Sequence, residues 1–110
     1  MDFKTLQENI KTLDKERPVI YRLNTQVEKE ILTKTIKLNE EVGELCNDTL
    51  SVLKLQRKSK LEKFDKRNFY EEFADVIITT VQLANAAGVD LERAINDKLT
   101  KINQRYHKDH

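Results

Sequence analysis

Helix-breaking residues are almost absent from this chain, which has 2 Gly and 1 Pro in 110 residues. An all-β sandwich or barrel needs many tight turns, and such turns are rich in these two residue types. Their scarcity excludes those folds and predicts an all-α protein. Since a domain typically has roughly 100–200 residues, residues 1–110 are expected to form a single domain.

The first two helices are predicted from apolar residues at helical spacing and from capping residues. One spans residues 2 to about 15, with Asp2 as its N-cap. The next begins at Asn24 or Thr25 and runs to about residue 56. Its apolar side chains fall on one stripe, which is expected to face the core: Val27, Ile31, Leu38, Val42, Leu45 and Val52.

Two further helices are predicted in the second half of the chain. The third begins at the cap Asn68 and ends before Gly88, and its apolar residues cover so much of its circumference that it is expected to be largely buried. The fourth is capped by Asp90 and runs to about Tyr106, with residues 107–110 as a loose tail.

The segment between the second and third helices is basic. Residues Lys54 to Arg67 include seven basic and two acidic residues and lack clean helical periodicity, so this segment is expected to be a loop. Nucleic-acid binding here is weakly supported, because single-strand binders interleave several aromatic residues and Phe64 stands alone. The net charge of +1 gives no general basic field either.

Three carboxylates lie together on the second predicted helix. Glu40, Glu41 and Glu44 are spaced by three and four residues, so they share one face at the edge of the apolar stripe. With 35% charged residues, such a cluster could also be part of a solvated surface.

A second acidic pair, Glu72 and Asp75, interrupts the most apolar helix. Ionised carboxylates in an apolar setting need partners. If this pair faces the acids of the second helix, their mutual repulsion calls for a cation. The set offers only oxygen ligands, since His107 and His110 lie in the tail, so it suits Mg²⁺, or Mn²⁺ as a substitute, better than zinc.

A basic stripe on the fourth helix complements these acids. Lys98, Lys101 and Arg105 follow one another at intervals of three and four residues. Such a row can hold the phosphates of a polyphosphate substrate. The alternative is an ordinary border to the core, with cations favoured near the end of a helix.

The chain resembles the MazG-like all-α nucleoside triphosphate pyrophosphohydrolases in three features taken together. These are the motif Glu40-Glu41-x-x-Glu44, the motif Glu72-x-x-Asp75 and the closing basic helix. The resemblance covers roughly residues 24–106. It implies a four-helix MazG-like bundle that is completed by oligomerisation, as a homodimer or a tetramer of dimers. It also implies Mg²⁺-dependent hydrolysis of a (deoxy)nucleoside triphosphate to the monophosphate and pyrophosphate.

The resemblance also assigns roles to residues. The metal ligands would be Glu41, Glu44, Glu72 and Asp75. The catalytic acid that orients or deprotonates the attacking water would be Glu40. The phosphates would be bound by Lys101, Arg105 and, with less support from the motif, Lys98. No residue can be assigned to the base, so the preferred base and sugar stay open.

Two other functions remain open at this point: a phosphoribosyl-ATP pyrophosphohydrolase, which shares the helical carboxylate scaffold, and a non-enzymatic helical interaction or regulatory protein.

The single Cys46 cannot form an intramolecular disulfide and suits a reducing compartment. No long apolar run indicates a membrane span or signal peptide, so the protein is expected to be cytoplasmic.

Overall fold

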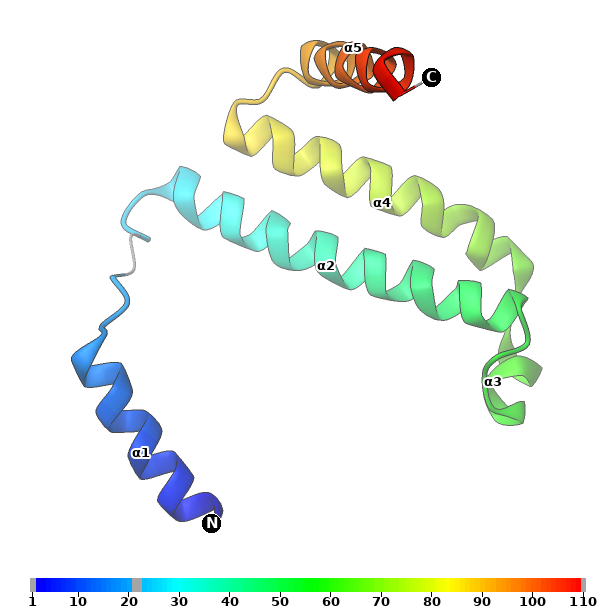
Figure 1. Cartoon of the computed structure of the whole chain (residues 1–110). Coiled ribbons are helices and arrows are strands. Elements are labelled where there is room, and N and C mark those ends of the chain that lie inside the picture. The colour runs from blue at the N-terminus through cyan, green and yellow to red at the C-terminus, as the bar shows by residue number, and fades with distance from the viewer. Residues whose placement is uncertain (1, 21–22, 110) are drawn as a thin grey trace.

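The computed structural model describes residues 2–20 and 23–109, and these residues form helices with no strand among them (Figure 1). The all-α prediction is confirmed. The predicted number of helices is wrong, because five follow one another along the chain: α1 (Phe3–Glu16), α2 (Gln26–Val52), α3 (Lys58–Lys63), α4 (Lys66–Ala87) and α5 (Leu91–Asp109).

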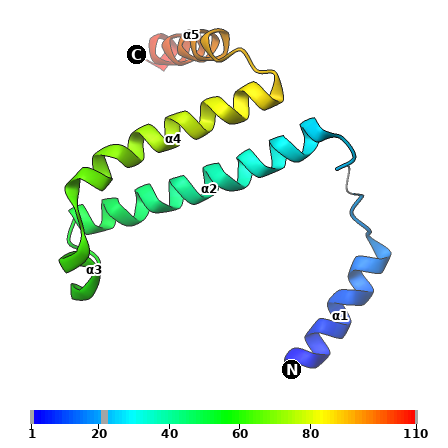
Figure 2. The same ribbon diagram turned by 180° about the vertical axis from the view of Figure 1, so that it is seen from behind.

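Helices α2 and α4 run side by side in opposite directions, and two views of the ribbon agree on this (Figures 1 and 2). Within the described ranges they are the only two helices in extensive contact. The first and last helices extend from the same end of this pair, where α2 begins and α4 ends, and neither packs along it (Figure 1). A single chain therefore forms a helical pair with α1, α3 and α5 appended, and the expected four-helix bundle is not complete within it.

Local capping determines where α2 begins and ends. Of the two candidate caps, Thr25 is used: its hydroxyl accepts from the backbone N–H of Glu28 at 3.1 Å, and the Glu28 carboxylate accepts from the N–H of Thr25 at 3.1 Å. The helix ends at Val52, earlier than predicted, because Lys54 adopts a left-handed backbone with φ of 58°. The N–H of Leu55 then bonds to the carbonyl of Leu50 at 2.8 Å, which closes the helix end.

The basic segment after α2 is more ordered than predicted. Residues Lys58–Lys63 form the short helix α3 instead of belonging to a continuous loop. The next helix, α4, begins at Lys66, and its N-cap is Asp65, whose carboxylate accepts from the N–H of Arg67 at 2.9 Å. Asn68 therefore lies inside the helix and is not its cap, because Asp65 offers a side-chain acceptor one turn earlier.

The end of α4 and the start of α5 follow their predicted signals, whereas the end of α5 does not. Gly88 ends α4 with a left-handed φ of 70°, as expected. The Asp90 carboxylate accepts from the N–H of Arg93 at 3.2 Å at the start of α5. This helix continues through Asp109, so residues 107–109 are helical rather than a loose tail, and residue 110 lies outside the described residues.

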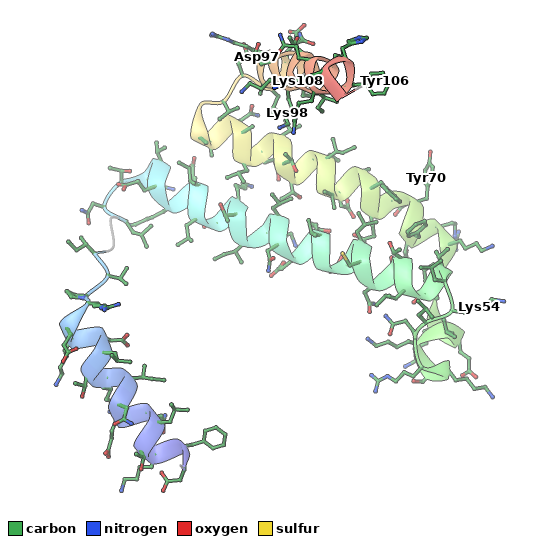
Figure 3. The ribbon with its side chains drawn as sticks, viewed as in Figure 1. Lys54, Tyr70, Asp97, Lys98, Tyr106 and Lys108 are labelled. Atoms are coloured by element: carbon green, nitrogen blue, oxygen red, sulfur yellow. The ribbon has the colours of Figure 1, made fainter. Side chains whose placement is uncertain are left out.

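The interface between α2 and α4 buries small and polar side chains. The buried residues of the described chain are Glu41, Ser51, Thr79 and Ala84, each 5–8% exposed. Many large apolar residues are exposed in a single chain, including Ile77 on α4, and Tyr70 points away from α2 (Figure 3). The expectation that this third predicted helix is largely buried is therefore wrong for one chain, since no other helix covers its outer face.

The apolar stripe of α2 is covered only in part. Ile31, Leu38 and Leu45 are half-buried against α4, whereas Val27 at one end and Val52 at the other stay exposed. Within the described residues, no helix is both long and apolar enough to cross a membrane.

Candidate metal centre

Three carboxylates from two helices converge at the middle of the α2–α4 pair. Glu41 of α2 and Glu72 and Asp75 of α4 each place one carboxylate oxygen within 4.8 Å of the others. Their burial is graded: Glu41 is buried, Glu72 is half-buried and Asp75 is exposed. The group is therefore sheltered on the α2 side and open to solvent beside Asp75, as a site that admits a ligand must be.

Two oxygens of this group have no hydrogen-bond partner among the described residues. They are Oε2 of Glu41 and Oε2 of Glu72, and both are buried. A buried acceptor without a partner is costly, and nearly all buried polar atoms in folded proteins are paired. A hard divalent cation would satisfy both oxygens, and an all-oxygen donor set is the one that Mg²⁺ and Mn²⁺ prefer. The residues present therefore fit the metal that the sequence predicts.

The electrostatics of the group also favour a cation. At separations within 4.8 Å, like charges repel by roughly 3 kcal/mol per pair at an effective dielectric near 20. Burial, followed by the neighbouring charge and hydrogen bond of Glu44 and the charges of Asp75 and Glu41, raises the pKa of Glu72 to about 7. Without a metal, a proton on Glu72 relieves part of this repulsion.

Glu44 lies next to the cluster but outside its three-oxygen core. It is exposed, and it lies near enough to Glu72 to raise the pKa of that carboxyl group. The predicted set of four metal ligands is thus brought to one place on the surface of the pair. Three of the four meet closely, and the metal-ligand roles of all four stay predictions.

Lys37, one turn before the acids on α2, was not singled out by the sequence analysis. Its ammonium group lies 3.3 Å from Oε2 of Glu40 and 3.3 Å from Oε1 of Glu41. The hydrogen bond to Glu40, and then that to Glu41, raises the pKa of Lys37. The intervals of three and four residues from Lys37 to the two acids are the signal that could have identified it.

This lysine joins the exposed Glu40 to the buried Glu41. The Glu40 side chain is 57% exposed, so the ion pair alone contributes little stability. Its effect is positional, because it keeps the predicted catalytic carboxylate beside the cluster. It also engages one oxygen of Glu41, Oε1, which is not the oxygen that lacks a partner.

The predicted phosphate-binding cations lie on a separate surface. Lys98, Lys101 and Arg105 line one hollow along α5, together with Gln104 and Lys108. No residue of the acidic cluster lines this hollow. Since α5 does not pack extensively on α2 or α4 in the described chain, one copy alone does not enclose acids and cations in the same pocket.

Comparison with known proteins bears on the same residues. A family model described as the MazG-like family matches residues 32–110, which include both acidic motifs and the α5 cations. No curated protein and no solved structure matches the chain. The family is associated with pyrophosphohydrolase activity of the nucleotide type. Because the match extends over more than half of its length, this chain belongs to the MazG-like family.

Proposed function

We propose that this chain is a Mg²⁺-dependent nucleoside triphosphate pyrophosphohydrolase that converts a (deoxy)nucleoside triphosphate to the monophosphate and pyrophosphate. The observation that carries the proposal is the convergence of Glu41, Glu72 and Asp75, with buried oxygens that lack partners. Membership in the MazG-like family supports the choice of a phosphoanhydride substrate.

The acidic cluster holds the metal in this proposal. Glu41, Glu72 and Asp75 provide the converging oxygens, and Glu44 joins them from its place beside Glu72. Bound Mg²⁺ supplies charge neutralisation at the phosphates and a lowered pKa for a coordinated water. The exposed position of Asp75 leaves the side on which the substrate enters open.

Glu40 is the residue proposed to accept the proton of the attacking water. A general base must lie within hydrogen-bond reach of that water, directly or through one further water. Lys37 is proposed to position it, because its ammonium group touches both Glu40 and the metal-binding Glu41. Attack at the α-phosphorus breaks the bond to the β-phosphate and releases pyrophosphate.

Lys98, Lys101 and Arg105 are proposed to contact the outgoing phosphates. One chain presents these cations and the acids on separate surfaces. We therefore propose a homodimer, or a tetramer of dimers, in which the α5 cations of one copy approach the acidic cluster of another. The exposed apolar seam of α5 supports such an assembly, since Ile95, Leu99 and Ile102 are about half exposed in a single chain.

The test is a screen of the purified protein with Mg²⁺ against canonical and modified NTPs and dNTPs, with phosphoribosyl-ATP as a separate arm. Product chromatography should show a monophosphate and pyrophosphate in equal amounts. Mn²⁺ should substitute for Mg²⁺, and chelation should stop the reaction. Release of orthophosphate, or no turnover of any nucleotide, would contradict the proposal.

A further inference from the structure

A cavity of about 220 Å³ lies where the end of α2, the short helix α3 and the first turn of α4 meet. Its lining includes Asn47, Asp48, Lys60, Lys63, Phe64 and Asn68. Helix α3 belongs to the basic segment that the proposed reaction has not used. The fold therefore brings two lysines from that segment against the pair of helices that carries the acidic cluster.

This cavity adjoins the proposed metal centre along both helices. Asp48 lies one turn after Glu44 on α2, and Asn68 lies one turn before Glu72 on α4. One helical turn rises about 5.4 Å, so the cavity begins one turn from the acids on each side. The cavity therefore lies beside the acidic cluster on the same pair of helices.

Contacts within the segment hold the cavity wall in place. The Lys60 ammonium group donates to Oδ1 of Asn47 at 3.4 Å, and the side-chain amide of Gln56 donates to the same oxygen at 2.7 Å. Gln56 also donates to the backbone carbonyl of Asn47 at 3.3 Å. These bonds tie α3 and the turn before it to the end of α2, so Lys60 has a defined position beside the cavity.

The lining of the cavity carries two lysines and two carboxylates. Asp65 also lines it, but the guanidinium of Arg67 lies 3.1 Å from its carboxylate and lowers the pKa of Asp65 through hydrogen bonds from the side chain and backbone. With Asp65 compensated, Lys60 and Lys63 face one other carboxylate, that of Asp48. Both lysines are in the last turn of α3, where the helix dipole also favours cations.

We propose that this cavity binds the pyrophosphate end of the nucleotide, with Lys60 and Lys63 contacting its phosphate oxygens. The inference rests on the proposed function, because it assigns a place to the leaving group of that reaction. It adds phosphate contacts from the same chain as the metal to those proposed for the α5 cations of another copy. A charge-assisted bond from each lysine would hold the leaving group as its negative charge develops.

The experiment measures binding of inorganic pyrophosphate in the presence of Mg²⁺ by calorimetry, so it needs no turnover. The double variant Lys60→Gln/Lys63→Gln should bind pyrophosphate at least about 10-fold more weakly, as expected for loss of two charge-assisted bonds. Its matched control is Lys58→Gln/Lys66→Gln, which removes the same charge from exposed positions of the same segment outside the cavity lining. Lys60→Arg/Lys63→Arg should restore most of the affinity.

The outcomes separate this inference from the proposed function. Equal pyrophosphate affinity in the cavity variant and its control, both with the far-ultraviolet CD of the wild type, would overturn the phosphate site even if the wild type hydrolyses nucleotides. Failure of the wild type to bind pyrophosphate would overturn it as well. Lysine-dependent pyrophosphate binding without hydrolysis of any nucleotide would support the site and contradict the proposed reaction.

Discussion

The α2–α4 pair and the α5 helix differ in which side chains they bury and which they expose. The pair buries polar side chains: its buried residues include Glu41 and Thr79, and Ala84 is the one buried apolar residue of the described chain. Helix α5 instead exposes an apolar seam, with Leu99 51% and Tyr106 61% exposed. The acidic cluster lies at a contact between two helices of one chain, whereas the apolar seam of α5 has no extensive contact within the described residues.

This difference indicates how the molecule divides its tasks. A chain of this size needs a buried apolar core for stability, and one copy does not provide it. The acidic cluster, by contrast, is complete within one copy at the level of its three converging oxygens. The comparison thus predicts that changes in the pair act on the reaction, and that changes in α5 act first on assembly.

The largest effect is expected from the pair itself. Glu41→Gln or Asp75→Asn should reduce Mg²⁺-dependent pyrophosphate release at least about 100-fold, because each removes a charged ligand from the cluster. Steady-state assays with product chromatography measure this, and the helical CD spectrum should persist. Glu71→Gln, an exposed neutralisation next to the cluster in sequence, is the control and should keep its activity. Full activity of both ligand variants would refute the metal-centre assignment.

The apolar seam of α5 provides the next test. Light scattering at micromolar concentration should give at least twice the chain mass of 13.0 kDa. Ile95→Asp/Ile102→Asp should shift the mass towards one chain, because two charges would be buried at the interface between copies. Asn96→Asp adds charge elsewhere on the same helix and should leave the mass unchanged. A monomeric wild type would contradict the prediction that α5 acts in assembly while the α2–α4 pair acts in the reaction.

The pH dependence of stability tests whether the carboxylates of the α2–α4 pair are close enough to repel one another. Glu72 has a pKa of about 7 in the folded chain against an ordinary value of 4.5, so the folded state holds this proton more tightly. Its contribution to stability is fully present below pH 4.5 and is lost as pH rises through 7. Metal-free protein should therefore melt at a higher temperature at pH 5.5 than at pH 8.

Two controls assign that trend to the cluster. Glu72→Gln should lose most of the difference between the two pH values, since it removes the titrating group. Saturating Mg²⁺ should raise the melting temperature at pH 8 more than at pH 5.5, because the cation competes with the proton. The same dependence in Glu72→Gln would assign the trend to other groups.

The smallest effect is expected at the turn between α2 and α3. Lys54 has a left-handed backbone, with φ of 58°, which glycine adopts without steric cost. Its side chain points outward, so its removal loses no packing (Figure 3). Lys54→Gly should raise the free energy of unfolding by about 1 kcal/mol at fixed protein concentration, measured by denaturant titration. Lys54→Ala keeps the steric cost and should give no such gain.

The sequence predicts a helix end correctly where a single capping residue determines that end. Thr25, Gly88 and Asp90 mark helix ends, as the structure shows, because a cap depends on atoms within one turn. The basic segment was misread, since α3 is only six residues long and too short for a periodic pattern. The end of α2 was missed because a left-handed lysine gives no signal in the sequence.

The candidate site could be predicted as far as faces of single helices. Spacing alone placed Glu41 and Glu44 on one face and Glu72 and Asp75 on another, and the structure brings these faces together. The contact of Lys60 with Asn47 could not be foreseen, because it depends on how the chain turns between two helices. One chain keeps the α5 cations apart from the acids, and their approach to an acidic cluster of a second copy stays a prediction.

The contact of Lys37 with Glu40 and Glu41 has a consequence for how the centre fills. Part of the positive charge that the carboxylates require already resides there, on a flexible side chain whose head is half in water. Because Lys37 engages Oε1 of Glu41, the oxygen without a partner, Oε2, stays available to an ion while Lys37 keeps its contacts. Binding of an ion should therefore leave the ion pairs of Lys37 and the two helices nearly unchanged.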